Sequence, residues 1–414
     1  SHMTYQAIVT TLKSVREHPN ADRLKLASCH WNQVVIGLNN TEWELWVYFP
    51  VDWRLSEDFA TRNDLVRRKD ADWNPTWGMF DVNRKIKIQK LRWEKSEWFW
   101  CPIALFESYK HNLKEWDMFT HIWDDLICEK FVTKATQNAQ WQWWAKKEIK
   151  SFPKHMDTDN IKYYWNNLTD WDLITITLKL HWTSQRQWLV PVLKDNPRWK
   201  FWSKTTFEFK NVLWTRNVIL LEKSDWGYHT IWFRRQAEAK ITPRKNEVWY
   251  YEIVWYEHEW KPIMWKVSLK GLDKDTRNEY KDILPEEMVY SYWLPDWASE
   301  VYVYRIAIVN EDWQVYDLPR SKVKERCRDC GVKYVPEIEQ LIFKKKDLKK
   351  LQKKLDWYHD WLDTIDNRHW REWVCIRVDK ASWGTDIYKM KNFLFLSLEH
   401  CQKESWDVDV EEAS

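Results

Sequence analysis

The chain has 414 residues, which is long enough for two domains that each bury a core. Its 65 Lys and Arg residues against 62 Asp and Glu residues give a formal net charge of +3, so any phosphate-binding site must be a local patch. Seven scattered cysteines exclude a dense disulfide scaffold, and no apolar run reaches the roughly 20 residues of a membrane span. We therefore expect a cytoplasmic (intracellular) protein with no membrane partner.

Two residue types occur at abnormal frequency. The chain has 6 Gly, against about 29 for an ordinary chain of this length, and 36 Trp. Several Trp follow Asp between apolar runs, where a hairpin ordinarily uses Asp-Gly because the turn needs a positive φ. These pairs are Asp52-Trp53, Asp72-Trp73, Asp170-Trp171, Asp225-Trp226, Asp296-Trp297 and Asp312-Trp313. We infer that most Trp occupy positions that are Gly in a parent sequence, with Trp199 and Trp249 as candidate exceptions. The alternative, a naturally Trp-rich protein, does not explain the missing Gly.

Residues 5 to about 130 alternate short β-type runs with turn-like breaks, a spacing typical of a small all-β barrel. The expected strands are 5–12, 33–38, 44–49, 85–91, 117–122 and 125–131. Two patterns, residues 17–24 (EHPNADRL) and 90–99 (KLRWEKSEWF), resemble the OB-fold of tRNA-binding modules and of one group of RNA ligases, in which Trp93 and Trp98 would be Gly. A plain Pro/Asn turn is the alternative interpretation of the first pattern.

We place the OB-like domain at residues 1–131 and a polar linker at 132–160. Residues 161–414 mix long β-type runs with a helix, which predicts an α+β domain of antiparallel sheets with flanking helices. The expected strands are 173–180, 218–221, 248–254, 299–309 and 374–378. A helix is expected from about 336 to 361, because Ile338, Leu341, Ile342, Leu348, Leu351 and Leu355 approximate a helical stripe. Its other faces carry Lys344, Lys345, Lys346, Lys349, Lys350, Lys353 and Lys354, either as a solvated face or as contacts to RNA phosphates.

Lys179 follows a β-type run directly, in the segment Lys179-Leu180-His181-Trp182. Alone, such a lysine indicates only surface charge. Further segments follow in a fixed order and contain Thr215-Arg216-Asn217, Tyr251-Glu252-Ile253, Tyr302-Val303-Tyr304, Arg371-Glu372-Trp373 and Lys389-Met390-Lys391. In this order they resemble the motifs of the covalent nucleotidyltransferases, the ligases and capping enzymes that form a lysyl-nucleotide intermediate. Trp182 and Trp373 stand where that family has Gly.

The resemblance implies roles for individual residues. Lys179 would be the nucleophile, with Lys389 and Lys391 facing the triphosphate. Tyr304, favoured over Tyr302, would stack on the purine. The expected nucleotide-binding residues are Leu180, His181, Arg186, Arg216, Asn217, Glu252, Tyr304, Glu372, Lys389 and Lys391.

The implied chemistry explains why these residue types belong together. A lysine amine has an ordinary pKa of about 10.4 and cannot attack phosphorus while it is protonated. Neighbouring cations, namely Lys389, Lys391 and a bound metal, would lower the pKa of Lys179 and neutralise phosphate charge. Glu252 and Glu372 would supply the oxygen ligands of Mg²⁺ (or Mn²⁺), although both residues are also interpretable as ordinary strand-edge carboxylates.

An OB-like domain placed first resembles the ATP-dependent RNA ligases with an N-terminal OB domain, followed by a nucleotidyltransferase (ATP-grasp-like ligase) domain. This implies that RNA ends, or a nicked duplex, are sealed through lysyl-AMP and RNA-adenylate by a monomer. An mRNA guanylyltransferase and an RNA- or tRNA-binding protein with an inactive nucleotidyltransferase domain are the alternatives. Because Trp182 and Trp373 replace family glycines, we expect the chain as written to be inactive. Cys327 and Cys330 are interpreted as a reduced pair rather than a zinc site.

Overall fold

A computed structural model gives the structure, which divides into two compact units, Ser1–Thr133 and Lys134–Ser414. It describes residues 6–30, 32–51, 53–67, 78–97, 99–131, 158–180, 183–193, 207–214, 219–220, 234, 236–258, 261–262, 267–295, 298–310, 314–358, 362–391, 394–395 and 397. Most of the predicted linker therefore lies outside the described residues. Its end forms strand β14 (Asp159–Asn160), which belongs to a sheet of the second unit. The fold is mixed α+β, with mostly antiparallel sheets.

The first unit is built from short antiparallel sheets around one apolar core. Its largest sheet has four strands in the order β10-β1-β5-β9. A second sheet has three strands in the order β2-β3-β4. The strands are β1 (Ala7–Thr11), β2 (Lys13–Glu17), β3 (Leu24–Cys29), β4 (Asn32–Gly37), β5 (Leu45–Phe49), β6 (Trp53–Leu55), β7 (Ile88–Leu91), β8 (Glu94–Glu97), β9 (Phe99–Pro102), β10 (Met118–Phe119), β11 (His121–Ile122), β12 (Asp125–Leu126) and β13 (Cys128–Lys130). Helices α1 (Glu57–Arg62) and η1 (Ile103–Tyr109) complete it. Within the described part of this unit, the strand pairings do not close into a barrel.

The two OB-like sequence patterns lie against each other in this unit. His18 is buried, and its Nε2 lies 3.0 Å from the carbonyl oxygen of Leu91. The side-chain amide of Asn20 donates a hydrogen bond of 3.1 Å to the carbonyl of Arg92. Residues 17–24 therefore hold the β7–β8 hairpin, although 73 positions separate His18 from Leu91.

Six tryptophans lie in the left-handed backbone region that favours Gly. They are Trp43, Trp93, Trp116, Trp123, Trp171 and Trp293, with φ between 55° and 77°. All six side chains are exposed, so burial of the indole does not compensate for the backbone strain. Of the predicted Asp-Trp turns, Trp171 follows the prediction. The turn prediction is wrong for Trp53, because this residue pairs with Lys130 at the start of β6. The other four pairs lie outside the described residues.

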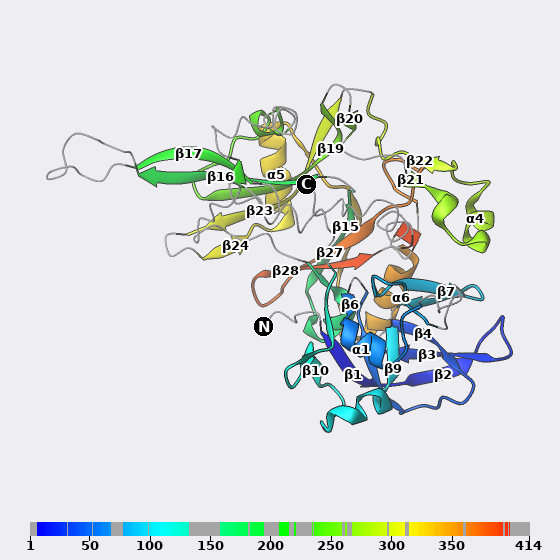
Figure 1. Ribbon diagram of the computed structural model, residues 1–414. Coiled ribbons are helices and arrows are strands. Elements are labelled where there is room, and N and C mark those ends of the chain that lie inside the picture. Colours follow the sequence, from blue (N-terminus) through cyan, green and yellow to red (C-terminus); the bar gives the residue numbers. More distant parts are fainter. Residues whose placement is uncertain are drawn as a thin grey trace. The chain divides into compact units, whose positions relative to one another are not determined.

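The second unit contains a five-stranded sheet of order β14-β28-β27-β15-β26. In addition to β14, the sheet contains β15 (Leu173–Lys179), β26 (Glu337–Ile342), β27 (Trp373–Asp379) and β28 (Thr385–Lys391). Strands β15, β27 and β28 lie side by side in Figure 1. One face packs Ile174, Ile176, Val374 and Ile376 against Leu351 of helix α6 (Leu348–Tyr358). The opposite face is therefore available for polar side chains.

The other large sheet of this unit has eight strands, in the order β18-β17-β16-β19-β23-β24, with β20 beside β19 and β25 beside β23. These strands are β16 (Thr183–Leu193), β17 (Phe207–Trp214), β18 (Ile219–Leu220), β19 (Glu247–His258), β20 (Lys261–Pro262), β23 (Ser299–Val309), β24 (Val315–Asp317) and β25 (Lys333–Tyr334). Helix α5 (Arg320–Cys330) covers one face through Val323 and Cys327 (Figure 1). The smaller elements are η3 (Ile161–Tyr163), η4 (Trp165–Asn167), β21 (Val267–Ser268), η6 (Leu269–Gly271), α4 (Lys274–Tyr280), β22 (Glu287–Met288) and η7 (Lys345–Asp347).

The prediction of one helix from 336 to 361 is wrong in its first part. Residues 337–342 form β26, which pairs antiparallel with β15 through partners such as Ile174 and Leu341. Apolar residues at 338, 341 and 342 fit a helical stripe, but the backbone groups of the β15 edge are satisfied better by a strand. Helix α5 was not expected, although Pro319 before it and Gly331 after it, at φ +67°, are typical boundaries. Among the described residues, no helix is long and apolar enough to cross a membrane.

The β7–β8 hairpin generates a stability prediction. Leu91 pairs with Glu94, and the two turn residues Arg92 and Trp93 both have positive φ, as in a type I′ turn that favours Gly. We expect Trp93→Gly to raise the free energy of unfolding by about 1 kcal/mol, because relief of the left-handed strain exceeds the entropy that Gly adds to the unfolded chain. Urea titration would measure it.

Trp383 supplies the matched control for this substitution. Its side chain is 76 % exposed, against 48 % for Trp93, and its φ lies outside the left-handed region. Trp383→Gly should therefore give no stabilisation. Equal effects of the two substitutions would contradict the role assigned to backbone strain.

Candidate active site

The register of three strands places the predicted lysines on one face of the five-stranded sheet. Lys179, at the end of β15, is the cross-strand partner of Trp373, and Trp373 is the partner of Lys391. Cys375 is the partner of Lys389. Because directly paired residues share a face, these side chains emerge on the side opposite the α6 core. The side chain of Lys391 itself lies outside the described part of the chain.

Lys179 forms an ion pair with Glu372. Its Nζ lies 3.2 Å from Oε1 and 3.1 Å from Oε2 of Glu372, and it donates a further hydrogen bond of 3.1 Å to the carbonyl of Leu180. The side chains of Lys179 and Glu372 are 19 % and 4 % exposed. A pair with little solvent access is screened weakly, so each charge depends strongly on its partner.

A buried polar turn precedes Glu372 and holds it at the start of β27. Both Nε and Nη2 of Arg371 donate to the carbonyl of Leu362, at 3.2 and 3.0 Å. The Asp363 carboxylate accepts from the backbone N–H of Ile365 at 2.7 Å, and burial raises the pKa of Asp363 to about 7. Sequence reasoning missed this turn, because its residues follow no period.

The second sheet contributes Glu252, Tyr304, Ser184 and Arg186 from three neighbouring strands. Ser184 pairs with Glu252 across β16 and β19, and its Oγ lies 2.9 Å from the hydroxyl of Tyr304 on β23. Glu252 and Arg186 are both buried. Burial, strengthened by the charge of Glu252, raises the pKa of Tyr304 well above its usual value, so its hydroxyl stays protonated. Burial also lowers the pKa of Arg186.

Cys375, the strand partner of Lys389, is affected by charges from both sheets. Burial raises the pKa of its thiol to about 11, and the charges of four side chains act on it. Lys179 and Lys389 favour the thiolate, whereas Glu372 and Glu252 oppose it. Glu252 comes from the eight-stranded sheet and the other three from the five-stranded sheet or its edge. Direct contacts thus join Glu372 and Lys389 to the surroundings of Lys179, and Glu252 acts on Cys375 through its charge.

Trp373 lies within this cluster. Lys179 Nζ is 5.0 Å and Lys389 Nζ is 4.6 Å from the centroid of its indole ring, within the range of cation–π attraction. The side chain is 5 % exposed. The indole therefore occupies space beside both predicted lysines, at a position where Gly would leave that space open.

Several predicted site residues lie outside the described residues, namely His181, Trp182, Arg216 and Asn217. No group of three His, Cys, Asp or Glu side chains with metal-binding geometry occurs in the part of the chain that the structure describes. The carboxylates that the resemblance assigns to a metal are Glu252 and Glu372, and both are buried. This set fits Mg²⁺, which is commonly held by one or two carboxylates and retains several waters.

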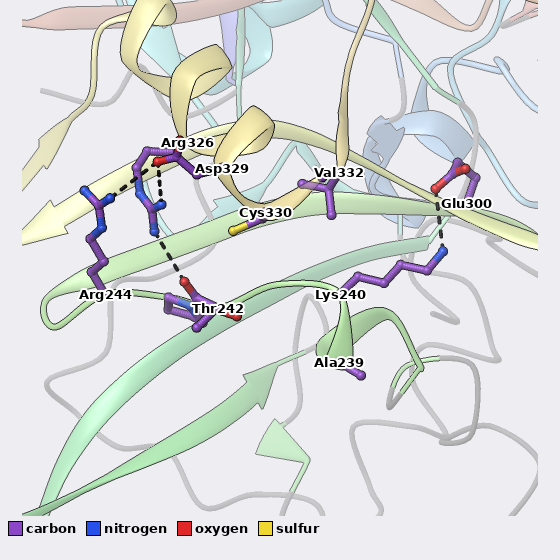
Figure 2. A pocket seen from close by; sticks show the side chains of 11 residues that line it. Ala239, Lys240, Thr242, Arg244, Glu300, Arg326, Asp329, Cys330 and Val332 are labelled. Atoms are coloured by element: carbon purple, nitrogen blue, oxygen red, sulfur yellow. Dashed lines mark hydrogen bonds and ion pairs between the residues drawn. The ribbon is translucent and has the colours of Figure 1, made fainter.

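A separate cavity of about 720 Å³ opens beside the C-terminal end of α5, and none of the predicted site residues line it. Figure 2 shows its charged side chains in two groups, one formed by Arg244, Arg326 and Asp329 and the other by Lys240 and Glu300. Asp329 lies 3.4 Å from Arg244 and 3.2 Å from Arg326, and Lys240 lies 3.6 Å from Glu300. Cys330 borders the cavity as a free thiol, and Cys327 is buried in the core beneath α5. The ion pairs join all three cations of the lining to its two carboxylates.

No protein-family model matches this sequence, and no curated protein matches it. Solved structures match its fold. One is a lysine-to-alanine variant of the Naegleria gruberi RNA ligase with ATP and Mn, with TM-score 0.60, 12% identity, and coverage of 96% of this chain and 99% of that chain. Another is a glutamate-to-alanine variant with AMP and Mn, with TM-score 0.60, 12% identity and coverage of 96% and 100%. The same ligase with PPi gives TM-score 0.57, 12% identity and coverage of 98% and 99%. The fold of this chain resembles that of an ATP-dependent RNA ligase.

The Lys179–Glu372 pair leads to a prediction about coupling. We expect Lys179→Met and Glu372→Gln each to lower the free energy of unfolding. The double variant should lose less free energy of unfolding than the two single losses added together, and we expect this difference, the coupling free energy, to be about 1 kcal/mol or more. A double-mutant cycle in urea measures this. The control cycle uses Lys270→Met and Glu286→Gln, a pair whose side chains are 73 % and 67 % exposed. There we expect a coupling near zero. Similar coupling in both cycles would show that burial does not strengthen the pair.

Proposed function

We propose that this chain has the architecture of an ATP-dependent RNA ligase, with Lys179 as the residue that accepts AMP. The observation that carries the proposal is the buried ion pair of Lys179 with Glu372, with Lys179 and Lys389 both lying over the ring of Trp373. The match to RNA ligase structures over nearly the whole chain supports the same conclusion. That ligase was solved with ATP and Mn, and we extend both ligand classes to this chain, with Mg²⁺ as an alternative metal.

Lys179 must lose a proton before it attacks phosphorus. Glu372, at 3.1 Å, favours the ammonium form, which opposes attack. Glu252 and Glu372 would hold Mg²⁺, which would supply positive charge against the carboxylates and the phosphates. Lys389, which lies over the same indole ring as Lys179, disfavours a second positive charge there and so favours the neutral amine that attacks. Glu372 therefore holds Lys179 in position before nucleotide binding.

The proposed reaction has three steps. Lys179 Nζ attacks the α-phosphorus of ATP, a P–N bond forms, and the P–O bond to pyrophosphate breaks. The AMP group then passes to an RNA 5′-phosphate oxygen, which restores the lysine amine. An RNA 3′-OH finally attacks that 5′-phosphate, gives up its proton, and displaces AMP. Lys389 and Lys391 stabilise the charge that develops on the phosphates, and Tyr304, held by Ser184, offers an aromatic face to the purine.

Trp373 favours a second candidate, an RNA-binding protein whose nucleotidyltransferase domain is inactive. The indole fills space beside Lys179 and Lys389, where the nucleotide would need close approach to the backbone. The strained tryptophans add a global cost of order 1 kcal/mol at each site, against a domain stability of roughly 5–15 kcal/mol. We therefore propose that the ligase chemistry is blocked in this chain as written.

The decisive experiment is adduct formation with labelled ATP and, separately, GTP in the presence of Mg²⁺. The chain as written and its Trp182→Gly variant should form little adduct. A version with Gly at 182, 373 and the six strained Trp positions should form lysyl-AMP with ATP only.

In the Gly-restored version, Lys179→Ala should reduce the amount of lysyl-AMP adduct at least 100-fold without changing the melting temperature, because the nucleophile is lost. The control is Lys333→Ala, which removes a lysine outside the site. An adduct that survives Lys179→Ala would remove Lys179 from the role, and labelling by GTP would favour a guanylyltransferase.

We further propose that the first unit is an OB-like module that grips the RNA duplex. Contacts of His18 and Asn20 with the β7–β8 hairpin support this, because they join the two OB-like patterns. In the Gly-restored version, deletion of residues 1–133 should leave lysyl-AMP formation within a few fold but reduce sealing of a nicked RNA duplex at least tenfold, since duplex RNA is held through shape and phosphates. Undiminished sealing by the truncated protein would show that the unit is not the RNA clamp.

A further inference from the structure

Helix α6 and the turn before it present lysines outward from the five-stranded sheet. Leu351 and Leu355 are buried against that sheet, so the remaining faces of the helix point to solvent. Five lysines on these faces are exposed, namely Lys345, Lys346, Lys349, Lys350 and Lys353. We refer to these five residues as the α6 lysine surface.

The positive charge of this surface is not balanced by carboxylates. None of the five lysines forms an ion pair within the described ranges. Lys354, on the same helix, pairs with Glu339, and Lys344 lies over the ring of Trp171. Asp347 and Asp356 are the acidic residues of the segment from 344 to 358, so the surface keeps an excess of positive charge.

The spacing of the lysines increases their mutual repulsion. Lys349 and Lys353 are separated by four positions within α6, and like charges at this spacing destabilise an α-helix. A bound polyanion removes that cost. From Lys349 to Lys353 the helix rises about 6 Å, so the charges form a short row rather than a single point.

The location separates this surface from the candidate active site. Helix α6 packs on the face of the five-stranded sheet formed by Ile174, Ile176 and Val374, whereas Lys179 and Lys389 emerge on the other face. A phosphate held by α6 is therefore not the phosphate that reacts at Lys179. The surface suits a long polyanion that extends beyond the reacting ends.

We propose that the α6 lysine surface binds the phosphate backbone of RNA at a distance from the site of sealing. The choice of RNA as the polyanion rests on the proposed function. The surface has the charge complementarity that backbone binding requires, and backbone binding needs no base recognition. An amphipathic membrane-binding helix would turn apolar residues outward, whereas Leu351 and Leu355 face the sheet.

The test is RNA binding by the whole chain, measured by fluorescence anisotropy of a fluorescein-labelled nicked RNA duplex in EDTA without ATP. Lys349→Gln, Lys350→Gln and Lys353→Gln together should weaken binding at least about tenfold and make the plot of log K against log salt shallower by about 2, because up to three counterion-releasing contacts are lost. Gln keeps a helix propensity close to that of Lys. The matched control changes Lys270, Lys274 and Lys281 to Gln, three exposed lysines on or beside α4.

The α6 variant should lose affinity while the control keeps it, and both should melt like the parent chain. Equal affinities and salt slopes for the α6 variant and the control would overturn the proposal. The proposal would also be overturned if the α6 variant kept its affinity for RNA but no longer bound phosphatidylserine vesicles, because that result would identify a membrane as the partner. Because the assay contains no ATP, RNA binding through α6 is measured even if Lys179 never forms an adduct. Failure of the ligase proposal and failure of this one are therefore distinguishable.

Discussion

The register between β15, β27 and β28 is the constraint on which the candidate active site depends. Lys179, Trp373 and Lys391 are partners across three strands, and Cys375 is the partner of Lys389. A slip of one residue would turn every side chain of a strand to the opposite face and bury a lysine in the α6 core. Ile174, Ile176, Val374 and Val378 prevent the slip, because they must stay on the packed face. The apolar residues of these strands thus fix the position of the charged ones.

The Lys179–Glu372 pair shows how two buried charges depend on each other. A buried carboxylate needs a cation, and Lys179 provides one. The polar turn that contains Asp363 and Arg371 keeps Glu372 at the start of β27. Trp373 lies against the pair, since its indole attracts both Lys179 and Lys389 and occupies the space beside them.

The sequence alone predicted the elements whose residues share one clear preference. The runs that became β15, β19 and β23 are rich in β-branched and aromatic residues, and they form long strands. Strand β16 was not predicted, because Gln185 and Gln187 resemble loop residues. Both are buried and hydrogen-bond to the hydroxyl of Tyr251, a contact that only the folded sheet supplies. The strand β26 was mistaken for helix for the same reason, since pairing with β15 is a tertiary interaction. Motif order named Glu372 and Lys389, which lie near Lys179. It carried no information about the turn of Asp363, because Arg368 and His369 of this turn contact Ser291 and Tyr290, which only the folded chain brings near.

The position of β15 has a consequence for the order in which the protein folds. Its two sheet partners, β26 and β27, both come from far downstream, and Lys179 is separated from Glu372 by 193 positions. At synthesis rates of 5–20 residues per second, roughly 10–40 s pass between the appearance of the two residues. During most of that time the apolar strand Leu173–Lys179 has both edges unpaired, which is the condition that favours association between nascent chains. Its second edge is protected only when β27 arrives, which is also when Glu372 reaches Lys179.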